Sequence, residues 1–255
     1  MTYEFVTPEP PKLRGGIAAG RIEIQTTEMA ETVVDVEAIR GDLEGLKVFQ
    51  HGREIVIEQR KRFGFKNDEY EVRIRAPHGS DIDLNLASAD IRADGRFGSL
   101  EVNTASGDVE VGEVDRNAKV RSASGDVQLG PVAGPLDVNT ASGDVQVHTA
   151  GAGGTIRSAS GDVQIGRAAE RVTVQTASGD QMIESVAEGS VDLKSASGDV
   201  QVGIKEGSRL HVDARSLSGD TTSEVELLGV ETGTEGPLVL VKAATMSGDI
   251  RIVRA

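Results

Sequence analysis

Apolar and polar side chains alternate along most of the chain, and turn-forming residues interrupt the alternation at regular intervals. In the stretch KVRSASGDVQLG (119–130), Val120 and Ser122 share one face of an extended segment. Val127 and Leu129 share one face of the next segment. The intervening Ser-Gly-Asp is typical of a turn, because glycine tolerates positive φ and Ser and Asp bond nearby backbone groups. A period of two therefore predicts short β-strands joined by glycine turns.

The Ser-Gly-Asp turn recurs at a nearly constant spacing. Its serine stands at positions 106, 124, 142, 160, 178, 197, 218 and 247. The first five copies are 18 residues apart, and the following gaps are 19, 21 and 29 residues. A degenerate copy, ASAD at 87–90, lies one period upstream. Internal repetition of this kind indicates a solenoid, in which each unit buries its apolar face against its neighbours.

The 18-residue period fits one circuit of a β-helix. At about 3.3 Å per residue, a circuit holds two or three short strands and their corners, and successive circuits pair as parallel strands about 4.8 Å apart. The sequence thus predicts an all-β parallel β-helix of roughly nine 18-residue coils, and the usual crossover preference favours a right-handed winding. Equivalent residues would stack in two internal ladders, one of Val120, Val138, Ile156, Val174 and Leu193, the other of Val127, Val145 and Val163.

Alternative folds fit the pattern less well. A sandwich of antiparallel hairpins also uses strands at 8–12-residue spacing, but gives no reason to repeat one turn every 18 residues. Helical periodicity is conceivable only over Gly166–Val172, which is too short to indicate a helix. The alanine before each repeat serine becomes Leu217 and Met246 in the last copies. This trend predicts a partly buried corner that widens toward the C-terminal end.

The two ends depart from the repeat. Residues 1–80 are expected to form a cap of mainly antiparallel strands, continuous with a solenoid region at 81–255 in a single structural domain. RKRFGFK (60–66) reads as the basic tip of a hairpin, either solvated or docking an acidic partner. The 29-residue gap contains the insertion VELLGVETGTEGP. The final strand around Arg251–Val253 leaves an open end, which the insertion or another subunit would cover.

The repeat turns supply the candidate site residues: Ser106, Gly107, Asp108, Ser124, Gly125, Asp126, Ser142, Gly143, Asp144, Ser160, Gly161 and Asp162. Carboxylates stacked about 4.8 Å apart repel by roughly 0.9 kcal/mol in bulk water. Either turn N–H groups bond the carboxylates, or cations such as Ca²⁺ lie between them, with Asp108, Asp126, Asp144 and Asp162 as weak metal candidates. We expect N–H bonding and no metal or cofactor, because the other half of each period lacks the Gly-x-Asp of the calcium β-roll.

Catalytic motifs are missing from the sequence. The four histidines, His51, His78, His148 and His211, have no shared spacing to the turns. A serine repeated eight times is no unique nucleophile, and no Gly-x-Ser-x-Gly elbow occurs. We therefore expect no enzyme. A Ser/Thr column could suggest an ice-binding face, but its alternation favours a hydrogen-bonded inner ladder; it comprises Thr104, Ser122, Thr140, Ser158, Thr176 and Ser195.

Composition narrows the function classes. The net charge of −14 argues against nucleic-acid binding, which needs Lys and Arg. There is no cysteine, no run long enough to span a membrane, and an N-terminal MTYEFVTPEPPKLRGG that does not read as a signal peptide. We therefore expect a cytoplasmic location. No aromatic residue follows Phe97, which favours a narrow core of stacked small aliphatics.

The repeats resemble a known family. VRSASGDVQLG, APHGSDIDLNLASADI and TMSGDIRIVRA are similar to segments of the bacterial β-strand-repeat proteins of unknown function, often labelled "putative adhesin". The resemblance covers nearly the whole chain and implies a β-helix. It implies no enzyme activity, and it brings no catalytic residues.

These observations favour a non-enzymatic scaffold or protein-interaction module whose flat faces bind a protein partner. One alternative is a self-assembling filament former similar to the bactofilins, since their circuits are of similar length. A second alternative is an exported, cation-binding adhesin. The sequence leaves the partner and the oligomeric state open.

Overall fold

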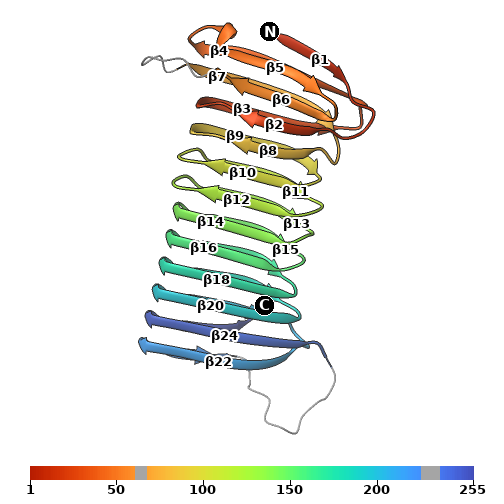
Figure 1. Ribbon diagram of the computed structural model, residues 1–255. Coiled ribbons are helices and arrows are strands. Elements are labelled where there is room, and N and C mark those ends of the chain that lie inside the picture. The colour runs from red at the N-terminus through yellow and green to blue at the C-terminus, as the bar shows by residue number, and fades with distance from the viewer. Residues whose placement is uncertain (61–67, 225–235) are drawn as a thin grey trace. The chain divides into compact units, whose positions relative to one another are not determined.

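The computed structural model describes residues 1–60, 68–224 and 236–255 (Figure 1). The predicted basic tip, apart from Arg60, and most of the predicted insertion lie outside the described residues. The chain divides into two compact units, unit 1 (Met1–Gly130) and unit 2 (Pro131–Ala255). The only described helix is the 3₁₀ turn η1 (Leu43–Gly45).

Unit 1 is built from two sheets. Its strands are β1 (Thr2–Val6), β2 (Lys12–Gly16), β3 (Ala19–Thr27), β4 (Glu31–Arg40), β5 (Leu46–His51), β6 (Glu54–Gln59), β7 (Glu69–Pro77), β8 (Asp81–Asn85), β9 (Ser88–Phe97), β10 (Leu100–Thr104), β11 (Val109–Val114), β12 (Ala118–Ser122) and β13 (Val127–Val132). Most of β13 belongs to unit 1, whose last residue is Gly130. In unit 1, sheet A has the order β1-β4-β7-β3-β9-β11-β13, and sheet B the order β5-β6-β2-β8-β10-β12.

Unit 2 has the same two-sheet plan. Its strands are β14 (Leu136–Ser142), β15 (Val145–Ala150), β16 (Gly154–Ser160), β17 (Val163–Ala168), β18 (Arg171–Ser178), β19 (Gln181–Val186), β20 (Gly189–Ser197), β21 (Val200–Ile204), β22 (Arg209–Ser218), β23 (Thr221–Ser223), β24 (Leu238–Ser247) and β25 (Ile250–Arg254). In unit 2, sheet A has the order β15-β17-β19-β21-β25-β23, and sheet B the order β14-β16-β18-β20-β24-β22.

Each coil contributes one strand to each sheet, and the predicted stacking is confirmed. Val138 pairs with Ile156, Ile156 with Val174, and Val174 with Leu193, all in parallel register. These four side chains are almost fully buried. Small β-branched and aliphatic residues therefore fill the space between the two sheets, and the chain is an all-β parallel solenoid. The right-handed winding stays a prediction.

The antiparallel strands expected near the N-terminus are present. β1 pairs with β4, β4 with β7, and β5 with β6, all antiparallel. The same stretch also contains two parallel coils, because β2 pairs in parallel with β6 and β8, and β3 with β7 and β9. Tyr70, fully buried, anchors this region through a hydrogen bond from its Oη to the carbonyl of Asp42 at 3.0 Å.

The last coil in sequence is not the last in space, so the open end expected at Arg251–Val253 is wrong. β24 and β25 lie between the β20/β21 coil and the β22/β23 coil, as Figure 1 shows for β20, β24 and β22. The inward residues of β24 and β25 include Val239, Val241 and Ile250, which are all buried. The corresponding residues of β22 and β23 are smaller or more polar than these where the two strands approach the Ser-Gly-Asp turn. The more apolar coil therefore occupies the interior layer, and β22/β23 forms the outermost one.

One local prediction also needs correction. The alanine corner is not partly buried: its late members Leu217 and Met246 are 81% and 60% exposed. Strand alternation explains this, because each lies next to the buried Ser/Thr column and so points to solvent. The segment Gly166–Val172 is not helical, as expected; it runs from the end of β17 into the start of β18.

Candidate functional site

The predicted repeat turns stack directly on one another. Gly125 has a φ of 110° and Gly161 a φ of 117°, in the region that side chains disfavour. A Cβ on Gly161 would collide with the carbonyl oxygen of Gly143, and a Cβ on Gly125 would meet that of Gly107. Glycine is therefore required at these positions for two reasons: the positive φ of the turn and the close approach of the neighbouring coil.

The aspartates of the turns form a hydrogen-bonded column. In unit 2 the backbone N–H of Asp162 donates to the carboxylate of Asp144, and that of Asp180 to Asp162, both at 2.8 Å. In unit 1 the N–H of Asp126 donates to Asp108 at 2.9 Å. A hydrogen bond to a charged group contributes about 1.5–3 kcal/mol and so offsets repulsion between neighbouring carboxylates, which is roughly 0.9 kcal/mol in bulk water. The N–H interpretation of the column is thus confirmed.

The column continues through the intercalated coil. The N–H of Asp249 donates to Asp199 at 2.8 Å, and the N–H of Asp220 donates to Asp249 at 3.0 Å. The sequence separation of the first pair is 50 residues. The turn chemistry therefore holds adjacent layers together whatever their order along the chain.

Cation binding by the aspartates gains no support from the side-chain arrangement. Within the described ranges, no three His, Asp or Glu side chains are grouped so that they could hold a metal ion. One oxygen of each paired carboxylate, as at Asp144 and Asp162, is already occupied by an N–H donor. Calcium binding by Asp108, Asp126, Asp144 and Asp162 stays an untested hypothesis.

The Ser/Thr column is an inner ladder, as expected. Thr104, Ser122, Thr140 and Ser158 are between 6% and 8% exposed. Their hydroxyl groups bond the adjacent turn: Ser122 Oγ donates to the carbonyl of Ser124 at 2.8 Å, for example. Because these side chains are buried, they cannot form an ice-binding face.

A buried glutamine interrupts the second apolar ladder, and sequence reasoning missed it. Gln181 pairs with Val163 and Val200 on its two sides and is 1% exposed. Its Nε2 donates to Thr176 Oγ1 at 2.7 Å and to the carbonyl of Lys194 at 2.8 Å, while its Oε1 has no partner. The signal was the single SGDQ among turns that otherwise continue with a β-branched residue.

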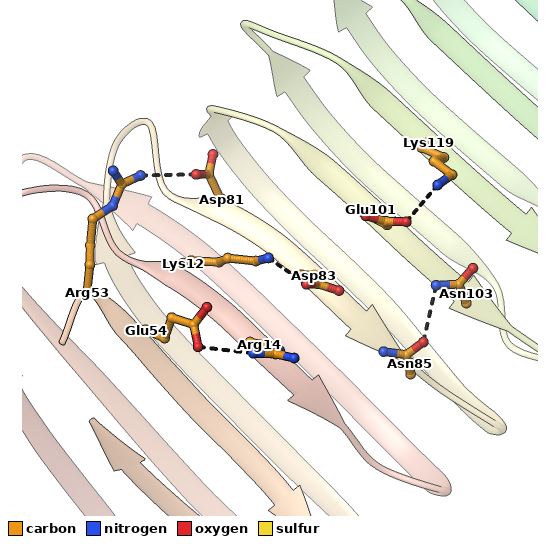
Figure 2. A network of polar contacts seen from close by, with 10 residues as sticks. All are labelled: Lys12, Arg14, Arg53, Glu54, Asp81, Asp83, Asn85, Glu101, Asn103 and Lys119. Atoms are coloured by element: carbon orange, nitrogen blue, oxygen red, sulfur yellow. Dashed lines mark hydrogen bonds and ion pairs between the residues drawn. The ribbon is translucent and has the colours of Figure 1, made fainter. Parts of the chain in front are cut away.

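The outer face of sheet B in unit 1 carries ion pairs that join neighbouring strands (Figure 2). Lys12 on β2 contacts Asp83 on β8 at 2.6 Å, and Lys119 on β12 contacts Glu101 on β10 at 2.9 Å. Figure 2 also shows the side-chain amides of Asn103 and Asn85 bonded to each other, at 3.1 Å. These pairs tie four coils at the surface.

Asp81 is the most highly connected carboxylate of this face. Its Oδ2 pairs with Arg53 at 3.1 Å, and its Oδ1 accepts the N–H of Ser99 at 2.8 Å and pairs with Arg116. The side chain is only 17% exposed. Asp81 thereby links the β5–β6 turn to the coils that follow β8, a role that its place in the motif APHGSDID did not reveal.

The outer face of sheet A in unit 1 contains a hollow of about 600 Å³, here called the arginine hollow. Its charged lining residues are Glu23, Asp35, Arg73, Arg75, Arg92 and Asp94, from β3, β4, β7 and β9. Ile24 and Ile74 contribute only main chain to its floor, because their side chains point into the core and are 1% exposed. About half of each arginine side chain is exposed.

Every arginine of the hollow is paired. Arg73 contacts Glu71 at 2.6 Å, Glu23 at 3.7 Å and Glu37 at 3.8 Å. The hydrogen bond and the charge of Glu71 raise the pKa of Arg73 above its usual value. Because the folded pKa is raised, any stability from this pair is present at neutral pH and is lost only as strongly alkaline pH passes the folded pKa. The hollow offers fixed, charged hydrogen-bond donors and acceptors to a partner.

Known structures share the fold. A "putative adhesin" from Parabacteroides distasonis ATCC 8503 is 12% identical, with a TM-score of 0.56, and the match covers 98% of this chain and 96% of that one. A "putative adhesin" from Parabacteroides merdae ATCC 43184 is 12% identical, with a TM-score of 0.50, and the match covers 100% and 96%. At this identity the likeness shows the fold alone. No curated protein matches the chain in sequence.

A family model places the sequence more firmly. The model described as Toastrack DUF4097 matches residues 17–253, which is most of both units. The expected resemblance is confirmed at this level, whereas Ser-Gly-Asp-Val repeats as a mark of the family stay a prediction. The chain belongs to the Toastrack DUF4097 family.

Proposed function

We propose that the chain is a non-enzymatic interaction module that binds a protein partner through the arginine hollow of unit 1. The observation that carries the proposal is the hollow itself, in which half-exposed arginines gather with carboxylates on the outer face of a sheet. Arginine is enriched at protein interfaces because its planar fork bonds carboxylates in two places. A partner segment that presents carboxylates and amides to these arginines fits this lining.

The geometry gives a reason why the paired charges would favour specificity. Arg73 is held by three glutamates, so its guanidinium is oriented before a partner arrives. Less side-chain entropy is then lost on binding. The neighbouring Asp35 and Asp94 repel a purely acidic partner, which leaves mixed-charge surfaces as the favoured class.

The test starts with the purified full chain as bait in an extract of the native host, followed by titration with each purified candidate partner. Arg73→Glu places a fourth acid among three glutamates, and we expect it to weaken binding at least about tenfold. Arg14→Glu is the matched control, because Arg14 pairs with Glu54 on the outer face of the other sheet. Equal losses in both variants, or none in Arg73→Glu, would overturn the hollow as the site.

A cytoplasmic location belongs to the same proposal. The described residues contain only a three-residue helix, so no described helix could cross a bilayer. Fractionation of the native host with an antibody to the chain tests the location. Recovery in the medium or at the cell surface would instead favour an adhesive role.

A further inference from the structure

The outermost layer of unit 2 leaves a long strand edge without a partner among the described residues. β22 is ten residues long and stands at the end of sheet B. The N–H of Arg209 donates to the carbonyl of Pro237, on the β24 side. By alternation, the backbone groups of Leu210, Val212 and Ala214 point to the other edge, where no described strand lies. Such an edge is a template for pairing with another chain.

The side chains of this layer are incompletely covered. Leu210, Val212, Ala214 and Ser216 point inward but are only half-buried, whereas their register partners on β24 are buried. A second layer placed against β22 would bury them. Burial of apolar surface yields about 25 cal/mol per Å², so the exposed ladder favours an occupant.

The charges on β22 identify a second copy of the chain as that occupant. Asp213 and Arg215 lie two residues apart on the outer face of β22, on either side of Ala214. If two β22 strands pair antiparallel about a twofold axis at Ala214, Asp213 of each copy faces Arg215 of the other. Ala214 is then in a hydrogen-bonded pair, as its edge-facing backbone requires, and the charges occupy the closer non-bonded positions.

Exposed apolar side chains support the same arrangement. In unit 2, all but Met182 on β19 lie at the two ends of β22 and β24: Leu217 and Met246 at one end, and Leu238 and Leu240, 44% and 40% exposed, at the other. Antiparallel pairing about a twofold axis places the Leu217 and Met246 end of one copy beside the Leu238 and Leu240 end of the other. Leu217 would then face His211 of the second copy, with Leu240 on the adjoining strand.

We infer that the β22 edge is a self-complementary interface, and that two copies join tail to tail through an antiparallel β22–β22 pair centred on Ala214. A twofold pairing uses each β22 edge once and therefore closes at the dimer. An open filament would instead require β22 to pair with a different edge of the next copy.

Sedimentation equilibrium over a concentration series tests the inference. The native chain is expected at about twice its mass of 26.8 kDa. Arg215→Asp sets Asp against Asp, and Asp213→Arg sets Arg against Arg, so each variant alone should dissociate at least about tenfold more readily. An equimolar mixture of the two variants should regain the dimer, because Arg faces Asp at both positions.

The control repeats the motif on an interior strand. Asp192 and Lys194 form an ion pair of the same two-residue spacing, at 3.1 Å, on β20. This strand has neighbouring strands on both sides. Lys194→Asp should leave the mass unchanged. Three outcomes would each overturn the inference: a monomer at every concentration, a mass that keeps growing with concentration, or a dimer that Arg215→Asp does not weaken. Circular dichroism melting checks that every variant is folded.

Discussion

The two units attach one coil to the next in different ways. In unit 1, ion pairs between different strands recur on both outer faces, as at Lys12–Asp83 and Arg73–Glu23. Among the ion pairs of the described residues of unit 2, only Arg157–Asp137 joins two strands, at 3.9 Å. Unit 2 relies mainly on the repeated turn, where the Asp N–H of one layer bonds the carboxylate of the adjacent layer.

The difference shows what a strict repeat allows. Where the same turn recurs in every coil, as in unit 2 even across its longer gaps, backbone groups and small side chains fall into register and hold the layers with few individual pairs. Where coil lengths and strand directions vary, as around β4 and β7, side chains specific to each position make the connections, including the buried Tyr70 and Phe97. Unit 2 should therefore be most sensitive to its turns, and unit 1 to particular carboxylates.

The largest expected effect comes from the turn glycine. Gly161→Val should lower the free energy of unfolding of unit 2 by at least about 3 kcal/mol, from backbone strain and from overpacking against Gly143. Gly207→Asn is the control, because Gly207 also has positive φ but no atom lies near its missing Cβ. Urea unfolding measures both. If the two substitutions cost the same, close stacking of the turns does not constrain the glycine.

In unit 1 the corresponding weak point is Asp81. Asp81→Ala leaves Arg53, Arg116 and the N–H of Ser99 without their acceptor and should cost about 2–3 kcal/mol. Asp83→Ala, two residues along the same strand, removes one surface pair with Lys12 and should cost under about 1 kcal/mol. Thermal melting of the two variants in parallel gives the ranking. A larger loss for Asp83→Ala would refute the role assigned to Asp81.

The aspartate column predicts a smaller effect with a clear local readout. Asp162→Ala removes the acceptor of the Asp180 N–H and should cost about 1–2 kcal/mol, whereas Asp162→Asn keeps an oxygen in place and should be close to neutral. Hydrogen exchange at the Asp180 amide should accelerate in the alanine variant only. Equal exchange in both variants would mean that the bond contributes little in solution.

The smallest effect should be a gain. Gln181→Val restores the apolar ladder between Val163 and Val200 and removes a buried oxygen that has no partner. We expect stability to rise by about 1 kcal/mol, partly offset by the two lost Nε2 bonds. Urea unfolding measures the change. A loss of more than about 1 kcal/mol would show that the bonds to Thr176 and Lys194 outweigh the unpaired oxygen.

The period of the pattern was enough to predict the solenoid, the inner ladders and the carboxylate–N–H column. These features depend on local alternation and on one repeated turn, both of which are visible in residues such as Val120 and Gly125. The intercalated last coil was not predictable, because the turns at Ser218 and Ser247 read alike and their order in space depends on long-range burial of Val239 and Ile250. The Asp81 hub and the arginine hollow depend on pairs of residues far apart in sequence, for which no periodicity exists.

β24 and β25 lie between the β20/β21 layer and the β22/β23 layer, although both layers precede them in sequence. The ribosome therefore makes the outermost layer of unit 2 before the layer on which it packs. During synthesis, β22 and β23 lack their native neighbours, β24 and β25, until residues up to about 254 have emerged. Gene duplication can lengthen such a protein by copying the 18-residue segments upstream, whereas a repeat appended after β25 would begin between two layers that are already paired.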